Sequence, residues 1–343
     1  MKIINPAIEI MHTGLEKNFM TPEQFIEKVG RTCYKSEDKI TADSAEKFVS
    51  GLVKRGHEAM IEHWNLIFKT DWQTYDTVID DWTMVMCTAN EDIETELGKR
   101  LRPFLRFTSQ ELYDGEVRNV VSGNIRAWRD YLRAWVDRFK VIPEYLCNTV
   151  RDYPTFFPEF QEYVRDHTVD GYFNPITVND LVGDVEHSVH HDVTVKFICD
   201  RGVSHEIVRH RTASFAQEST RYCNYGLGKF GGEITVVMPA KWIDIPLDKR
   251  INDRRYASWY SAGRNAEMGY FLMLDAGSTP QEARAVLPNS LKTEVIMTGN
   301  LNCWDHFFKL RCAPDAHPDI QVVAKMVRNE FEDLFPERYS QKG

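Results

Sequence analysis

Two segments of the chain, residues 121–133 (VSGNIRAWRDYLR) and residues 297–309 (MTGNLNCWDHFFK), resemble each other. Each contains Gly-Asn followed by Ile or Leu, a Trp and an aromatic residue at the same offsets. An internal repeat constrains a fold strongly, because a repeated sequence predicts a repeated structural unit. Two interpretations stay open: duplication of a structural unit, or two amphipathic helices that share a Trp by chance.

Capping signals and apolar periodicity divide the chain into helices and strands. Thr21 with Gln24 and Thr279 with Glu282 are capping-box patterns, and each is followed by a Pro at the first helical position. The spacing predicts helices at residues 21–30, 252–275, 290–311 and 318–335, and strands at residues 1–10, 65–69, 193–197 and 234–240. We therefore expect an α+β fold, a sheet flanked by helices.

Residues 70–185 differ in character from their surroundings. They combine clustered aromatic and charged residues with several prolines, and they contain one clear helical pattern around residues 124–139. We expect an inserted, mostly helical subdomain at residues 70–185, within a domain formed by residues 1–69 and 186–343.

The composition excludes several classes of protein. The net charge is -9, whereas general nucleic-acid binding favours a broad basic face. Mean hydropathy is -0.43, and no apolar run approaches the length of a membrane span. The seven cysteines are scattered without a CxxC pair, which indicates reduced thiols. We expect a cytoplasmic protein that binds neither nucleic acid nor membrane.

The segment RHRTASFAQESTRY, residues 209–222, concentrates cations and hydroxyls in this acidic chain. Arg209, Arg211 and Arg221 carry planar donor groups that suit bidentate phosphate recognition. Ser214, Ser219 and Thr220 can donate hydrogen bonds to phosphate oxygens or to a base edge. The segment predicts a local pocket for a phosphorylated small molecule.

This segment also resembles a family signature. Arg-His-Arg, seven residues and then Ser219 match the signature of flavin-dependent thymidylate synthases. Flanking segments are similar to the family as well: RTCYKS (31–36), GHEAMIEH (56–63), DRGVSHEIVRHR (200–211), ARAVLPNSLKTE (283–294) and FFKLR (307–311). The resemblance covers roughly residues 1–69 and 190–335, and residues 70–185 look like an insertion found in longer members.

The resemblance implies an enzyme that makes dTMP from dUMP. Methylenetetrahydrofolate supplies the carbon, and NADPH reduces a bound FAD that supplies the hydride. Members of the family are homotetramers whose sites are shared between subunits, and they use no cysteine nucleophile. The partners implied are therefore dUMP, folate and NADPH.

Site residues follow by position in the resemblance. Arg311 matches the arginine that polarises the uracil ring, a role in which a fixed cation stabilises developing negative charge. The dUMP positions are Glu206, Ile207, Val208, Arg209, Gln217, Glu218, Ser219, Thr220, Arg221, Arg284 and Arg311. The FAD positions are His57, Arg209, His210, Arg211, Gln217, Asn300, Asn302 and His306.

The sequence departs from the family pattern at several of these positions. Asn302 stands where the family's N-x-R has arginine, Gln217 replaces a frequent glutamate, and Glu206 stands where glutamine is common. Arg126 in residues 124–126 (NIR) keeps the N-x-R form that the later copy lacks. We interpret that helix as a structural copy and not as a second flavin site.

Other functions fit the sequence less well. EHSVHH (186–191) is expected to lie on a strand, where adjacent histidines point to opposite faces and form no metal site. The chain contains no GxGxxG after a strand and no Walker loop. Two alternatives stay open: an RNA-binding module that uses Arg-His-Arg and nearby aromatics, and a catalytically silent homologue.

Overall fold

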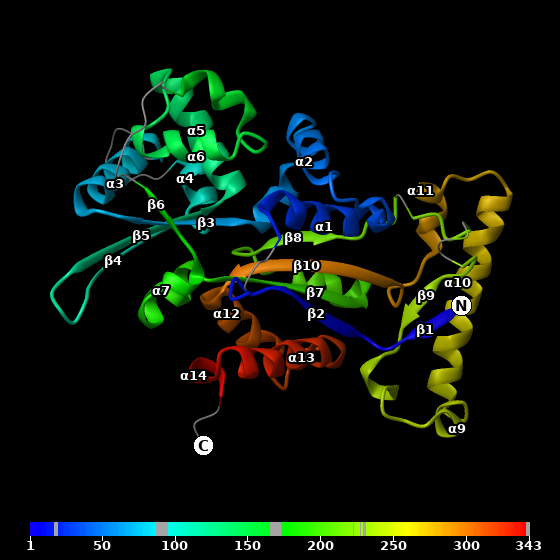
Figure 1. The fold of residues 1–343 in the computed structure, drawn as a ribbon. Coiled ribbons are helices and arrows are strands. Elements are labelled where there is room, and N and C mark those ends of the chain that lie inside the picture. The colour runs from blue at the N-terminus through cyan, green and yellow to red at the C-terminus, as the bar shows by residue number, and fades with distance from the viewer. Residues whose placement is uncertain are drawn as a thin grey trace.

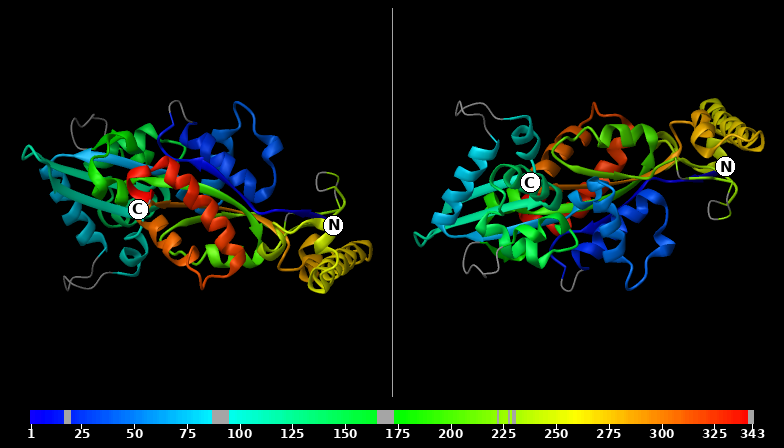
Figure 2. Two further views of the ribbon diagram at one scale, coloured as in Figure 1. Left: turned by 90° about the horizontal axis from the view of Figure 1, so that it is seen from below. Right: turned by 90° about the horizontal axis from the view of Figure 1, so that it is seen from above.

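The computed structural model describes residues 1–16, 20–86, 95–164, 173–221, 223–226, 228 and 231–340. Two four-stranded sheets and one two-stranded pair organise the chain (Figure 1). The hairpin of β4 (Leu105–Glu111) and β5 (Val117–Asn124) lies at one end, and helix α10 (Arg254–Asp275) lies at the other (Figure 2). None of the helices within the described ranges has both the length and the apolar character that crossing a membrane requires.

The central sheet has the order β2-β7-β10-β8, with antiparallel neighbours throughout. Its strands are β2 (Ala7–His12), β7 (Asp192–Asp200), β8 (Ser214–Gln217) and β10 (Lys292–Asn300). Helices cover both sides of it (Figure 1): α1 (Pro22–Tyr34) and α2 (Ala45–Lys54) on one, and α12 (Leu301–Arg311), α13 (Pro318–Leu334) and α14 (Pro336–Tyr339) on the other. The α+β fold class is therefore confirmed.

The second sheet has the order β4-β5-β3-β6, where β3 is Asn65–Thr70 and β6 is Asn174–Ile176. The helical segments around it are η2 (Glu58–His63), α3 (Trp72–Met86), α4 (Glu96–Leu101), α5 (Ile125–Phe139), α6 (Cys147–Asp152) and α7 (Gly183–His190). Residues 70–185 thus contribute strands as well as helices, and they share one core with Ile26 and Leu52. The boundary expected at residue 70 falls at the end of β3.

A smaller unit completes the fold. Strands β1 (Lys2–Ile4) and β9 (Thr235–Val237) pair in parallel beside α10. The short helices α9 (Leu247–Arg250) and α11 (Pro280–Ala283) flank α10 in the chain. The capping boxes expected at Thr21 and Thr279 are both present, and α10 and α13 lie where apolar spacing predicted helices.

The helix expected over residues 290–311 is wrong in its first half. Residues 292–300 form β10, and the helix α12 begins only at Leu301. Because β10 lies inside the sheet and is buried on both faces, its sequence lacks the alternation that marks a half-exposed strand. The side chain of Asn300 caps α12 by accepting a hydrogen bond from the Cys303 N–H at 2.9 Å.

Two smaller expectations are also corrected. Helix α1 continues through Gly30 to Tyr34, because a side chain at position 30 would collide with the ring of Phe48 and glycine permits that close packing. Residues 186–190 belong to helix α7 and not to a strand. Helix α7 is followed by strand β7, and β7 leads into residues 201–211.

Candidate functional site

Arg311, the last residue of α12, lies at the centre of a polar cluster. Its Nη1 donates to the Glu206 carboxylate at 2.9 Å, and its Nη2 donates to the Glu206 carbonyl oxygen at 3.0 Å. Its Nε donates to Nε2 of His210 at 3.1 Å. Five N–H groups belong to a guanidinium, so one on Nη1 and one on Nη2 remain for other acceptors. The structure thus brings together three residues that the sequence predicted for the site.

His210 is held as a neutral imidazole. Its Nε2 accepts from Arg311, so the proton lies on Nδ1, and this buried atom has no partner among the residues that the structure describes. Burial, with the nearby charge of Arg311, lowers the pKa of His210 to about 4. The ring also packs against Phe307 and His306, at centroid distances of 5.0 and 5.7 Å. The Nδ1–H is therefore a fixed, buried donor without a partner in the described part of the chain.

The two arginines on either side of His210 are exposed. Helix α8 (Arg201–Ile207) starts at the side-chain cap of Asp200 and ends just before Arg209. Neither Arg209 nor Arg211 makes an ion pair with a residue in the described ranges. Two uncompensated cations next to a buried donor suit an anionic ligand such as a dinucleotide.

A second group of predicted residues follows strand β8. The Nε2 of Gln217 donates to Ser204 Oγ at 3.0 Å and to Thr293 Oγ1 at 3.3 Å. The Arg284 guanidinium lies 3.4 Å from Thr220 Oγ1, so these two parts of the chain meet. Ser219 is half-buried and Arg221 is exposed, so both border the solvent side of this group.

Lysines that the prediction did not include join this group. Lys292 donates to Glu218 at 2.8 Å and also pairs with Glu294, and Lys35 pairs with Glu294 at 2.6 Å. These cations hold the pKa of Glu294 at about 2 despite its burial, and the carboxylates raise the pKa of Lys35. Both lysines line a cavity of about 540 Å³ beside Glu218. Their signal was the RTCYKS and NSLKTE segments, in which a lysine stands beside the residues of the site.

Three residues predicted for the flavin make other contacts. The amide of Asn300 caps α12 and donates to the Val189 carbonyl at 2.8 Å, so both of its ends are engaged within the chain. Asn302 accepts from Arg338 at 3.3 Å. His57 is exposed, and its recorded partner is the Tyr34 hydroxyl at 3.2 Å. The flavin contacts expected of these three residues stay predictions.

The remaining predicted residues divide by burial. Ile207 is fully buried in the core of the central sheet, so its side chain contributes packing, whereas Val208 is exposed.

Burial raises the pKa of the Cys33 and Cys223 thiols to about 12, which makes poor nucleophiles of them. Cys87 lies outside the described residues. Within the described ranges, no group of three or more His, Cys, Asp or Glu residues is arranged to hold a metal ion.

Comparison with known families identifies the region that contains these clusters. A family model described as thymidylate synthase complementing protein matches residues 167–337. The match includes the Arg311 cluster and the Gln217 group except for Lys35. The segments at residues 31–36 and 56–63 lie outside the matched range.

Curated relatives agree with this match. A flavin-dependent thymidylate synthase from Geobacter sulfurreducens is 33% identical over 143 residues, 42% of this chain and 57% of the relative. A protein of the same name from Sulfolobus acidocaldarius is 28% identical over 185 residues, 54% of this chain and 62% of the relative. The chain therefore spans about three fifths of the length of these relatives.

One solved structure gives a weaker similarity. It is a UMP/dUMP methylase from Streptomyces cacaoi bound with 5-Br dUMP, 25% identical to this chain. The alignment covers 46% of this chain and 80% of the methylase, with a TM-score of 0.35. A TM-score this low does not establish a common fold.

Proposed function

We propose that the chain is a member of the family of flavin-dependent thymidylate synthases and that it converts dUMP to dTMP by reductive methylation. In this proposal methylenetetrahydrofolate is the carbon donor and NADPH is the reductant. FAD supplies the hydride when it is bound. The observation that carries the proposal is the Arg311 cluster, because it holds a cation rigidly while leaving two of its N–H groups for a substrate.

Arg311 activates the nucleotide in this proposal. The two free N–H groups donate to a carbonyl oxygen of the uracil ring and stabilise the negative charge that develops as C5 becomes nucleophilic. Glu206 and His210 fix the guanidinium, so little reorganisation is needed when the substrate binds. The carboxylate of Glu206 also offsets part of the charge of Arg311, which a neutral glutamine at this position does not do.

The residues around His210 fit a bound flavin dinucleotide. The Nδ1–H of His210 is a buried donor without a partner in the described part of the chain, and Arg209 and Arg211 supply charge for the phosphates. His306 lies beside the His210 ring and borders the same place. Because His57 is exposed and contacts a different region, its predicted flavin contact requires sites shared between subunits, as in the predicted homotetramer.

The Gln217–Arg221 segment is the second half of the proposed dUMP site. Arg284 and Arg221 provide cations for the nucleotide phosphate, and Ser219 and Thr220 provide hydroxyl donors. Glu218 itself is buried and paired with Lys292, so it positions the segment.

Purified protein tests the proposal directly. We expect flavin absorbance, together with NADPH oxidation that depends on both dUMP and methylenetetrahydrofolate. A silent homologue would bind flavin and dUMP but would show no such dependent oxidation. An RNA-binding module would show no flavin and would bind single-stranded RNA in a salt-dependent manner. Cytoplasmic localisation remains a prediction.

A further inference from the structure

The two similar segments of the sequence occupy equivalent places in the two sheets. Strand β3 pairs with β5 so that Asn65 faces Asn124, and β7 pairs with β10 in the same register so that Asp192 faces Asn300. A helix follows at once in both cases. The N–H of Ile125 donates to the Trp64 carbonyl and that of Leu301 to the His191 carbonyl, both at 3.1 Å.

The asparagines that end the two strands have the same role. Asn124 caps α5 by accepting from the Ala127 N–H at 2.8 Å, as Asn300 caps α12 at 2.9 Å. The third strands correspond as well. Phe107 of β4 faces Val121 of β5, and Phe215 of β8 faces Met297 of β10. Chance similarity of two Trp-containing helices does not explain three strands and a helix in one register.

A histidine of each unit is also hydrogen-bonded to a hydroxyl group of the other unit. The Nδ1 of His63, in the first unit, lies 2.7 Å from Thr298 Oγ1 in the second. The Nδ1 of His190, in the second unit, lies 2.7 Å from Ser122 Oγ in the first. Ser122 and Thr298 occupy the same position, two residues before the capping asparagines. Reciprocal bonds of this kind are those of a two-fold interface.

We infer that residues 56–139 and 183–311 are two copies of one structural unit, related by an approximate two-fold axis within the chain, and that only the second copy carries a ligand site of its own. The identity of the ligands in this inference rests on the proposed function. The family match begins at residue 167, so it covers the second copy and excludes the first.

The first copy lacks the groups of the Arg311 cluster. The residue eleven positions after Asn124, equivalent to Arg311, is the buried Trp135. The register of β4 places Leu101, Arg102 and Pro103 at the positions of the Arg-His-Arg motif. At these positions, the described residues of the first copy therefore do not combine unpaired cations with a buried donor as the second copy does.

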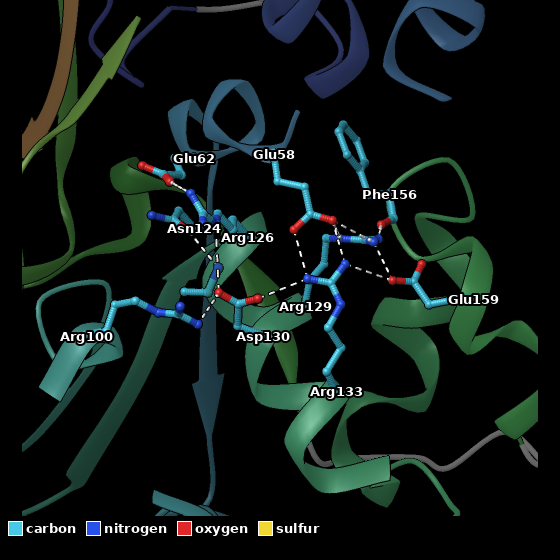
Figure 3. Close-up of polar contacts among 11 residues, drawn as sticks. Glu58, Glu62, Arg100, Asn124, Arg126, Arg129, Asp130, Arg133, Phe156 and Glu159 are labelled. Carbon is cyan, nitrogen blue, oxygen red and sulfur yellow. Dashed lines mark hydrogen bonds and ion pairs between the residues drawn. The ribbon is translucent and has the colours of Figure 1, made fainter. Parts of the chain in front are cut away.

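Three arginines of α5, Arg126, Arg129 and Arg133, are held in ion pairs (Figure 3). Glu58 lies between Arg129 and Arg133 and accepts from both, at 3.2 Å from Arg129 Nε and 2.8 Å from Arg133 Nη1. Arg129 is only 1% exposed and also reaches Glu159 and the Phe156 carbonyl. Such a cluster is closed to an added anion, since its cations are already paired.

Arg126 is the decisive position, because it keeps the N-x-R pattern. It pairs with Glu62 and lies 3.8 Å from Asp130 (Figure 3). Its side chain is 35% exposed, compared with 1% for Arg129 and 40% for Arg133. If the first copy contributed to a flavin site, Arg126 would be the residue that contacts the flavin.

Flavin stoichiometry of the full chain tests this inference. We expect equilibrium dialysis of the purified protein with FAD to saturate at one FAD per chain. Saturation at two FAD per chain would overturn this inference and would leave the proposed function intact. Absence of binding would overturn the proposed function and, with it, the claim that the second copy carries a site.

Matched variants assign the single site to one copy. Arg209→Ala together with Arg211→Ala is expected to weaken FAD binding at least tenfold, whereas Arg126→Ala is expected to change the affinity by less than about twofold. Thermal melts of the three proteins check that each is folded. A tenfold loss in folded Arg126→Ala would show that the first copy takes part in the site and would contradict the inference.

Discussion

The Nε–H of Arg311 donates to Nε2 of His210, and this one bond fixes both partners. It sets the tautomer of His210, with the proton on Nδ1, and it orients the guanidinium toward the space beside α8. Burial lowers the pKa of His210, and the charge of Arg311 lowers it further because protonation of His210 would place two cations in contact. The bond therefore couples the flavin side of the proposed site to its nucleotide side.

Acid should destabilise the protein through its buried histidines. Burial lowers the pKa of His63 and His190 to about 3 and that of His210 to about 4, below the usual value near 6.5. The contribution of each neutral histidine to stability is fully present above pH 6.5. It is lost as the pH falls below 6.5, because the histidine then binds a proton in the unfolded state before it does so in the folded state. Urea titrations should show a free energy of unfolding that decreases below pH 6.5, by up to about 1.4 kcal/mol per pH unit for each histidine.

His63→Asn should flatten this pH dependence, because the variant removes one titrating group. His317→Asn is the matched control, since His317 is exposed and asparagine can replace it as the cap of α13. An unchanged slope in His63→Asn would mean that His63 does not titrate between the two states.

Glu206→Gln should raise the affinity for dUMP. The amide oxygen can still accept from Arg311, but the compensating negative charge is removed. We expect the dissociation constant for dUMP to fall roughly two- to tenfold at low salt. Glu330→Gln, at an exposed position on α13, is the control for the change in net charge. A weaker affinity would indicate that the Glu206 carboxylate accepts a hydrogen bond from the nucleotide.

Gln217→Glu should destabilise the folded protein. The amide donates to the hydroxyls of Ser204 and Thr293, and a carboxylate there would lose both donations and add charge near Glu218. We expect chemical denaturation to report a loss of about 1–3 kcal/mol. The exposed Gln281→Glu should change stability by less than about 0.5 kcal/mol. Equal effects at the two positions would remove Gln217 from this packing role.

Asn124→Ala and Asn300→Ala should destabilise the protein to a similar extent. Both side chains cap a helix that directly follows a strand, and loss of such a cap costs about 0.5–2 kcal/mol. Differential scanning calorimetry of the two variants makes the comparison. No loss in either variant would contradict the capping role, and a loss in only one would contradict equivalence of the two copies.

Local signals predicted local structure well. The capping residues Thr21 and Thr279 marked helix starts, and the apolar spacing of α13 marked its buried face. The sequence could not distinguish β10 from a helix, because a strand buried on both faces shows no period of two. The Asn300 cap was the available signal for where the strand ends.

Long-range relationships could not be predicted in the same way. The Arg311 cluster was predicted by resemblance and joins residues about 100 positions apart, and the contact of His63 with Thr298 spans 235 positions. No local pattern encodes such a contact, since it depends on how the two sheets pack. The repeat was visible in one strand-helix segment, but the first part of each copy, η2–β3 and α7–β7, has diverged too far in sequence to be recognised.

Formation of dTMP by Arg311→Ala tests the central claim most directly. Purified wild-type protein and the variant are each incubated with FAD, NADPH, methylenetetrahydrofolate and dUMP, and dTMP is measured by mass spectrometry. Lys309→Ala, on the exposed face of the same helix, is the control. The account predicts dTMP from the wild type and the control, and none from Arg311→Ala, which still binds FAD. Undiminished dTMP formation by Arg311→Ala would contradict it.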